Sequence, residues 1–354
     1  MRHNALRNCF SKDEGMRAKR PTRQDVATKA GVAPSTVTLI LNERGAGLGI
    51  PEATRERVQA AARDLGYYPN WHIRSIRSGK TGNLGLYLRS DQWGKPHGYW
   101  TQVIAHLQKA VAGADLRILL HCAPADCPTE EAFARQAGGV VDGVIIVNSG
   151  HDPIAQRLME TGLPAVEIGD RYSALPLVAV DGAQGIQLAV KHLWERGYKR
   201  PAFCWDSSQY LLNAQSREQA FYESVKEQFG LDRSQVSSLE IPDNADPYAE
   251  LWRLNPRPDC VVCTSDELAF TLLESAIAAG IDVPNELGIT GFDCLPAFAP
   301  VRTLTSVATP LEQMARDGVT KLLALIEGKP VEASTVLPVA LRQGTSTRAA
   351  LEKK

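Results

Sequence analysis

Residues 22–70 read TRQDVATKAGVAPSTVTLILNERGAGLGIPEATRERVQAAARDLGYYPN, three short amphipathic segments separated by glycine or proline. Thr22 and Asp25 have the spacing of a helix-capping box, and Gly31 suits the left-handed end of the helix that they begin. Pro34 suits the first turn of a second helix, where its missing N–H costs nothing. Two short helices joined by such a turn indicate a helix-turn-helix.

The apolar residues of these segments repeat at helical spacing, so each predicted helix has one inward face. The third helix is expected to begin near Pro51 and Glu52 and to end at Gly66. On the second helix the small polar residues Ser35, Thr36 and Thr38 are left to point outward, which suits insertion into a groove. The expected inward residues are Val26, Ala27, Ala30, Val37, Ile40, Leu41, Val58, Ala61, Ala62 and Leu65.

Charge separates this region from the rest of the chain. Residues 1–80 hold 15 Lys and Arg against 7 Asp and Glu, a net charge of +8, whereas the remainder holds 24 against 33, a net charge of −9. A basic helix-turn-helix before an acidic body favours attraction to the phosphate backbone of DNA over a neutral three-helix bundle.

The words DVATKAGVAPSTVTLILN and TRERVQAAARDLGYYPN resemble the headpiece of the lactose repressor (LacI/GalR) family of bacterial transcription regulators. The resemblance rests on several sequence motifs that occur at fixed spacing and in the same order as in that family. It implies operator binding by a headpiece at residues 21–69, followed by a hinge segment at residues 70–80.

Length and composition place limits on the protein class. The chain has 354 residues, of which 44% are hydrophobic, enough for about two to three globular domains. It has neither an apolar run long enough to span a membrane nor the apolar core of a signal peptide, so we expect a cytoplasmic protein. The seven cysteines are scattered. Cys260 and Cys263 have a CxxC spacing inside an apolar strand word, which favours packed core thiols over a zinc or redox site.

From Thr81 onward, short apolar runs alternate with longer amphipathic stretches, as in LGLYL, GYWTQVIAHLQKAVAGA and LRILLHC. This alternation predicts parallel sheets with helices on both faces, and ligands in such folds gather at the carboxyl ends of the strands. The predicted fold class is an α/β core of two doubly wound parallel-sheet subdomains, preceded by an all-α headpiece.

The body also resembles the effector-binding core of the same family, which is related to periplasmic sugar-binding proteins of type I. The resemblance implies two similar subdomains with a cleft between them, and crossings near Asp181, Pro310 and Ala340. Residues 1–20 are expected to form a basic, disordered extension. The implied core spans 81–348, with an N-subdomain at about 81–180 and 310–340, a C-subdomain at about 181–309 and 341–348, and a tail at 349–354.

Within the headpiece, the resemblance implies base reading by Pro34 and Ser35 and backbone contacts by nearby polar residues. A solvated helix face is the alternative for each polar member. Leu39 replaces a common arginine and can make only apolar base contacts, and Ala33 replaces the usual serine cap. The expected DNA-contacting residues of the headpiece are Thr22, Gln24, Pro34, Ser35, Thr36, Thr38, Leu39 and Asn42.

The segment PNWHIRSIRSGKTG resembles the hinge of the family, which inserts an apolar side chain into the minor groove. Ile76 stands where leucine is usual, and Ile73 where alanine is usual. The resemblance implies Ile76 as the inserted residue and Asn70, Arg74 and Arg77 as neighbours of phosphates; an exposed linker is the alternative.

The resemblance also implies an effector site. Arg217 in SREQAF and Asp293 in GFDC match cleft positions, and Asn213 and Ser265 match further ones. Ser265 replaces a common asparagine, and Cys294 a common second aspartate. Trp93 fits a stacking role or simple loop packing, and Trp205 is a weaker candidate of the same kind.

The leading interpretation is a homodimeric, effector-controlled repressor that binds double-stranded operator DNA and a small molecule, most simply a carbohydrate. The alternative is a sugar-binding protein or sensor without operator control. We expect no enzyme, cofactor or metal, since P-loop, GxSxG and HExxH words are absent. The sequence leaves six points open: the identity of the effector, induction or corepression by it, activation or repression of transcription, the operator sequence, assembly beyond a dimer, and a translation start at Met1 or Met16.

Overall fold

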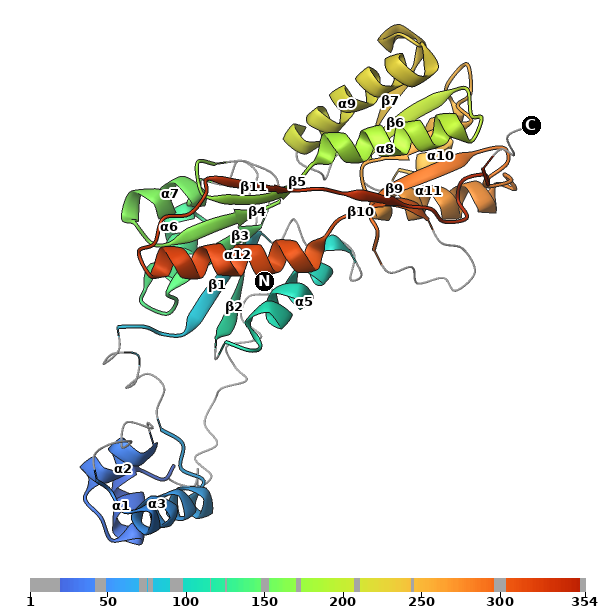
Figure 1. Ribbon diagram of the computed structural model, residues 1–354. Coiled ribbons are helices and arrows are strands. Elements are labelled where there is room, and N and C mark those ends of the chain that lie inside the picture. The colour runs from blue at the N-terminus through green and yellow to red at the C-terminus, as the bar shows by residue number, and fades with distance from the viewer. Residues whose placement is uncertain are drawn as a thin grey trace, which may run out of the picture. The chain divides into compact units, whose positions relative to one another are not determined.

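The described residues of the headpiece form three helices: α1 (Arg23–Ala30), α2 (Pro34–Leu41) and α3 (Glu52–Leu65) (Figure 1). The chain divides into two compact units, Met1–Thr81 and Gly82–Lys354. The computed structural model describes residues 20–41, 49–69, 75, 79–89, 98–114, 116–124, 126–147, 153–169, 173–206, 211–242, 245–295 and 304–350, with the side chains of 211–214 left aside.

The capping box predicted for α1 is confirmed. Asp25 N donates to Thr22 Oγ1 at 3.3 Å, and Thr22 N donates to Asp25 Oδ2 at 2.7 Å. Gly31 ends α1 at a φ of 67° and Gly66 ends α3 at a φ of 66°, a left-handed conformation that glycine adopts without a steric penalty.

One valine from each helix lies at the centre of the headpiece. Val26, Val37 and Val58 are all fully buried, and smaller alanines let the helices approach around them. Such a small apolar core stabilises the headpiece by about 1.5–3 kcal/mol for each fully buried valine.

In the core, the described residues form two six-stranded sheets joined by segments of one chain. The first sheet has the strand order β11-β5-β4-β3-β1-β2, and the second has the order β12-β10-β9-β8-β6-β7. The strands of the first sheet are β1 (Asn83–Arg89), β2 (Arg117–Ala123), β3 (Gly143–Val147), β4 (Ala165–Ile168), β5 (Leu177–Val180) and β11 (Ser334–Leu337). Those of the second are β6 (Pro201–Asp206), β7 (Ser237–Ile241), β8 (Cys260–Cys263), β9 (Gly288–Asp293), β10 (Thr305–Ala308) and β12 (Ala340–Arg342).

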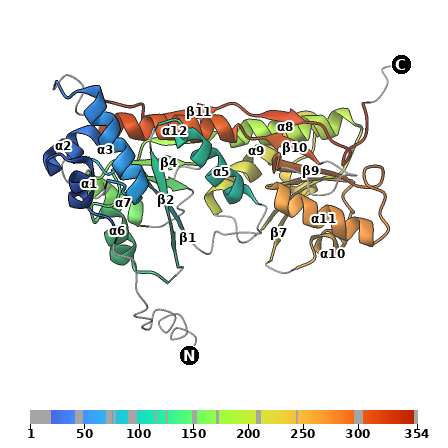
Figure 2. The same ribbon diagram turned by 90° about the horizontal axis from the view of Figure 1, so that it is seen from below.

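Helices cover both faces of each sheet, so central strands such as β3 and β8 are continuously apolar. On the first sheet α5 and α12 pack on one face and α6 and α7 on the other; on the second, α8 and α9 face α10 and α11 across the sheet (Figures 1 and 2). These helices are α5 (Tyr99–Val111), α6 (Thr129–Ala137), α7 (Ile154–Thr161), α8 (Gly182–Glu195), α9 (Leu211–Phe229), α10 (Pro247–Trp252), α11 (Asp266–Ala278) and α12 (Leu311–Ile326), with a short 3₁₀ turn at Arg233–Gln235.

The predicted fold class is confirmed, with one addition. All the described strand pairs are parallel except β12, which runs antiparallel to β10. The chain passes from β11 into β12 without a helix to reverse its direction, so it enters the second sheet from the opposite end (Figure 1). Three segments thus connect the sheets: β5 to α8, β10 to α12, and β11 to β12.

Candidate functional site

The headpiece presents the first turns of α2 as a candidate DNA-reading surface. Ser35 is exposed, and Pro34, Thr36 and Leu39 are half-buried, while Val37 and Ile40 point into the headpiece core. Gln24 on α1 is also exposed. These small polar and apolar groups leave the α2 backbone able to approach a groove.

Two of the predicted DNA contacts already have partners inside the headpiece. The Thr22 hydroxyl donates to Asp25 Oδ2 at 2.8 Å within the capping box. The Thr38 hydroxyl donates to the Pro34 carbonyl at 3.1 Å and accepts from Arg23 Nη1 at 3.2 Å. The Arg23–Thr38 bond joins α1 to α2 and helps fix the angle between them.

Several expected contacts lie outside the described residues. They are Asn42, and Asn70, Arg74, Ile76 and Arg77 of the predicted hinge segment. Trp93 of the predicted effector site lies outside them as well, as does the side chain of Asn213.

In the core, Arg217 and Asp293 lie at the carboxyl ends of neighbouring strands of the second sheet. Arg217 projects from α9, is only 6% exposed, and donates from Nη1 to the Thr264 carbonyl at 2.6 Å, just beyond β8. Its guanidinium carbon lies 3.8 Å from the centre of the Phe292 ring, next to Asp293 on β9. The two residues predicted from the resemblance are thus brought to one sheet edge.

Asp293 has an unusual backbone. Its φ is 100° and that of Cys294 is 55°, a region that side chains other than glycine rarely adopt. The Thr309 hydroxyl donates to Asp293 Oδ1 at 3.3 Å, and Cys294 N donates to the Ser306 hydroxyl at 3.0 Å. Strain of this kind is stored where surrounding contacts hold it, commonly at binding sites.

Ser265 has a structural role that was not predicted from the sequence. Its hydroxyl accepts from Leu268 N at 3.2 Å and caps α11, and the residue is only 6% exposed. Serine before an acidic first turn is a recognised capping pattern, and the word SDELA carries that signal.

The sequence reasoning also missed Asp266, a carboxylate that is 1% exposed. It accepts from Leu295 N and from the Ser306 hydroxyl, both at 2.6 Å. The pKa of Asp266 is raised to about 7: burial is the largest cause, the nearby Asp293 charge acts in the same direction, and the hydrogen bonds from Ser306 and Leu295 partly oppose the rise. Asp266 therefore ties the turn after β9 to β10 directly behind Asp293.

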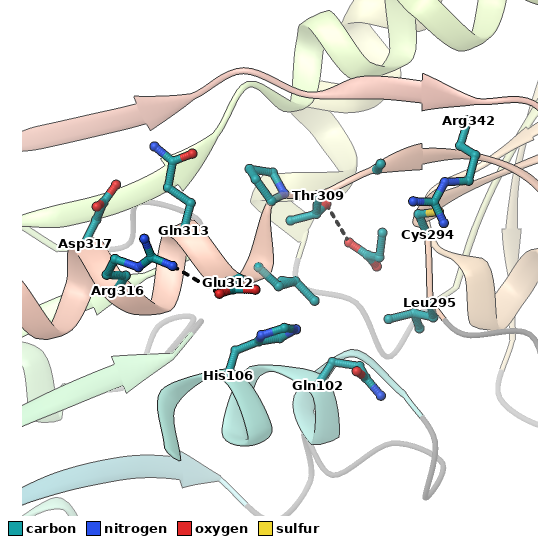
Figure 3. Close-up of a pocket in the computed structure, with 14 residues that line it drawn as sticks. Gln102, His106, Cys294, Leu295, Thr309, Glu312, Gln313, Arg316, Asp317 and Arg342 are labelled. Carbon is teal, nitrogen blue, oxygen red and sulfur yellow. Dashed lines mark hydrogen bonds and ion pairs between the residues drawn. The ribbon is translucent and has the colours of Figure 1, made fainter. Parts of the chain in front are cut away.

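A cavity of about 650 Å³ opens beside Asp293. Gln102 and His106 of α5 line it from the first subdomain, and Asp293, Cys294 and Arg342 line it from the second, with Thr309 between them (Figure 3). The Arg342 side chain points toward Cys294, and its charge lowers the pKa of that thiol against the larger raising effect of burial. The lining therefore includes apolar groups, polar groups and charges of both signs.

Two kinds of site are not found in the part of the chain that the structure describes. No three His, Cys, Asp or Glu side chains there are grouped to hold a metal ion. Likewise, no described helix is long and apolar enough to cross a membrane. The thiols of Cys260 and Cys263 are fully buried, and burial raises the pKa of both, as expected for packed core cysteines.

The fold defines a class of protein, a helix-turn-helix headpiece attached to a periplasmic-binding-protein-like core. Residues 22–70 match the family described as bacterial regulatory proteins, lacI family, and residues 190–347 match the periplasmic binding protein-like domain. The maltose regulon regulatory protein MalI of Escherichia coli (strain K12) is 30% identical over 78% of this chain and 80% of its own length. The chain therefore belongs to the lacI family of bacterial regulatory proteins.

Other relatives span almost the whole chain. The HTH-type transcriptional regulator RegA of Clostridium saccharobutylicum is 26% identical over 92% of this chain and 98% of its own. The lac repressor dimer bound to operator and the anti-inducer ONPF has the same fold, with a TM-score of 0.76 at 21% identity over 94% of this chain and 100% of that one. The CelR–cellobiose complex matches with a TM-score of 0.67 at 26% identity over 92% and 100%.

Proposed function

We propose that this protein is a transcription regulator, acting as a repressor, that binds operator DNA through its headpiece and a small-molecule effector in its core. The observation that carries the proposal is the headpiece itself, whose sequence matches the family over residues 22–70 and whose α2 has Ser35 exposed and Thr36 and Leu39 half-buried. Family membership favours a regulator over an enzyme. We propose the cytoplasm as its compartment, since a regulator of this kind must reach bacterial DNA.

For the headpiece, we propose that Pro34, Ser35 and Leu39 read bases. The other residues proposed to contact DNA lie at or near its phosphate backbone, except Ile76, which enters the minor groove. The internal bonds of Thr22 and Thr38 suggest that these two act through their backbone or by orienting α1 and α2. The other proposed DNA-contacting residues are Gln24, Thr36, Asn42, Asn70, Arg74, Ile76 and Arg77.

For the core, we propose that a sugar or sugar derivative binds at the carboxyl ends of β8 and β9, with Arg217 and Asp293 as its main polar contacts. Trp93, Asn213 and Ser265 complete the proposed set. Two similar regulators support this class of ligand: one was solved as a complex with cellobiose, and another has bound ribose. The boundaries proposed for the headpiece, hinge and subdomains are those expected from the sequence.

We also propose that two copies act together. The related lac repressor was solved as a dimer on its operator, and two headpieces related by a two-fold axis would read a near-palindromic site. An effector that favours one arrangement of the subdomains would then change DNA affinity by its differential affinity for the two states.

Selection of binding sites from random double-stranded DNA tests the proposal. We expect enrichment of a near-palindromic sequence, with affinity that falls steeply as salt rises because phosphate contacts release counterions. The control is the core from residue 82 onward, which should enrich nothing. Failure of the full chain to enrich any sequence would contradict the proposal.

A further inference from the structure

The first residue of α1 is an exposed arginine that has no ion pair among the described residues. Arg23 directly follows the N-cap Thr22, at the end of the helix where the backbone dipole is positive and acidic side chains are favoured. Elsewhere in the headpiece a cation has its carboxylate, since Lys29 pairs with Asp64 at 2.9 Å. The described headpiece therefore gives the Arg23 charge no anion, and a partner molecule with acceptor groups would supply one.

A hydrogen bond carries the Arg23 guanidinium from α1 to α2. Arg23 Nη1 donates to Thr38 Oγ1 at 3.2 Å, and the Thr38 hydroxyl donates in turn to the Pro34 carbonyl at 3.1 Å. A threonine hydroxyl has one proton, so this bond uses the only donor of the Thr38 side chain. Thr38 is therefore suited to hold Arg23 in place and poorly suited to donate to a base itself.

Thr38 lies on the face of α2 opposite the headpiece core. Val37 and Ile40 are buried, and Ser35, Thr38 and Leu39 share the other side of the helix at the spacing i, i+3 and i+4. Ser35 is exposed and the other two are half-buried. The bond to Thr38 thus brings a guanidinium from α1 to the same face of α2 that is proposed to enter the groove.

This face has few hydrogen-bond donors of its own. Leu39 can make only apolar contacts, and Ser35 provides a single hydroxyl. The guanidinium uses one N–H on Thr38, and its other N–H groups have no partner among the described residues. Two parallel N–H groups of a guanidinium match O6 and N7 of guanine in the major groove, a pair of acceptors that distinguishes guanine from the other bases.

We propose that Arg23 reads a base: held by Thr38 at the outer face of α2, its guanidinium recognises a guanine of the operator half-site. Thr38 is then the positioning residue. This inference rests on the proposed function for operator binding and adds to it a residue of α1 that determines which sequence is bound.

The test is selection from random double-stranded DNA with the full-length protein, followed by affinity measurements on the selected half-site and on its single-base substitutions. We expect the unaltered protein to prefer guanine at one position of each half-site. Arg23→Met should reduce that preference about tenfold or more, because a bidentate contact is removed. Arg23→Lys should keep the attraction to DNA and lose most of the preference, because lysine has the charge without the fork.

Thr38→Val tests the positioning role. It removes the hydroxyl at nearly constant volume, so the preference for guanine should fall at the same position and at no other. Adding Thr38→Val to Arg23→Met should cause no further loss there, since both changes remove one contact. Arg57→Met is the matched control, because Arg57 is an exposed arginine of α3 with no ion pair among the described residues, and its loss should leave the selected sequence unchanged.

The outcomes separate this inference from the proposed function. If Arg23→Met weakens binding to all sequences alike and makes the salt dependence shallower, Arg23 contacts phosphates and base reading is overturned. An operator selected by the unaltered protein, with the same base preferences in Arg23→Met and Arg23→Lys, refutes this inference alone. If the unaltered protein selects no sequence, the proposed function fails and base reading fails with it. If Arg23→Met does not fold, Arg23→Lys and Thr38→Val decide the question.

Discussion

The Thr309 hydroxyl donates a hydrogen bond to Asp293 Oδ1 at 3.3 Å, which joins the end of β9 to the segment that leaves the second sheet for α12. Asp293 is a proposed ligand contact, and Thr309 directly precedes Pro310, where α12 begins. A group that binds Asp293 therefore acts one hydrogen bond away from a connection between the subdomains.

Thr309→Val should weaken this link without a change in side-chain size. We expect the free energy of unfolding to fall by about 1 kcal/mol, the usual net value of one hydrogen bond, and the effect of ligand on operator affinity to fall with it. Urea unfolding and operator titrations with and without ligand measure the two quantities. Thr309→Ser keeps the hydroxyl and should behave as the unaltered protein; equal coupling in the valine variant would contradict the prediction.

Leu39→Arg should change which operator is selected. Arginine can form two hydrogen bonds with guanine, which are worth about 1–3 kcal/mol of discrimination, whereas leucine offers only apolar contact. In selection from random DNA, we expect one position of each half-site to shift toward guanine. Leu39→Ala serves as the control for loss of the leucine, and an unchanged selected sequence in Leu39→Arg would exclude Leu39 as a base-reading residue.

The Asp266 carboxyl should make the core less stable as pH rises. Its pKa in the folded protein is raised from 3.8 to about 7, so the folded state holds its proton between these values and the unfolded state does not. The stabilising contribution is complete below pH 3.8 and is lost as pH rises through 7, by at most about 4 kcal/mol.

Asp266→Asn removes this titration. The difference in unfolding free energy between the variant and the unaltered protein should therefore shift in favour of the variant from pH 4 to pH 8, as measured by urea unfolding along the pH series. Glu274→Gln, at an exposed position on the same helix, is the control. Parallel pH profiles for Asp266→Asn and the unaltered protein would refute the assignment.

His192 should have the opposite effect. It is 6% exposed, its Nε2 lies 2.8 Å from the Thr347 hydroxyl, and burial followed by the Arg196 charge lowers its pKa from 6.5 to about 4. The folded state favours the neutral ring, so stability is lost as pH falls from 6.5 through 4, by at most about 3 kcal/mol. His192→Gln should therefore be less sensitive to acid over this range than the unaltered protein, as measured by urea unfolding along a pH series. Equal acid sensitivity in the two proteins would count against this explanation.

Gly185 controls the position of the Phe292 ring that supports Arg217. A Cβ at Gly185 would lie 2.5 Å from a Phe292 ring carbon and 2.9 Å from Val307 Cγ1, both in the packed core. Gly185→Ala should cost about 1–3 kcal/mol of stability through overpacking and weaken ligand binding by displacing the ring. Gly113→Ala, where nothing lies within 4 Å, should leave both quantities nearly unchanged. A stable alanine variant with intact ligand affinity would show that the ring position does not matter.

The sequence predicted those features that depend on neighbours in the chain. The capping box of Thr22 and Asp25, the glycine ends of α1 and α3, and the strand–helix alternation are all local patterns, and the structure confirms them. Asp266 was missed because its partners, Leu295 and Ser306, lie 29 and 40 residues away and become neighbours only when β9 and β10 pair. The motif SDELA is typical of a helix cap, but Ser265 was assigned to the effector site because it matches a ligand-binding position of the family.

The three segments that join the sheets limit how the core can move. Pulling the subdomains apart would stretch the passages at Asp181, Pro310 and Pro338 together, whereas turning one subdomain on the other needs only small changes of backbone angle at each. Because three segments connect the subdomains, rotation of one subdomain on the other is the easier motion and separation of the two is strongly resisted. A ligand at the edge of the second sheet can therefore rotate the subdomains at little cost in free energy. Such a rotation changes the backbone angles of all three connections at once.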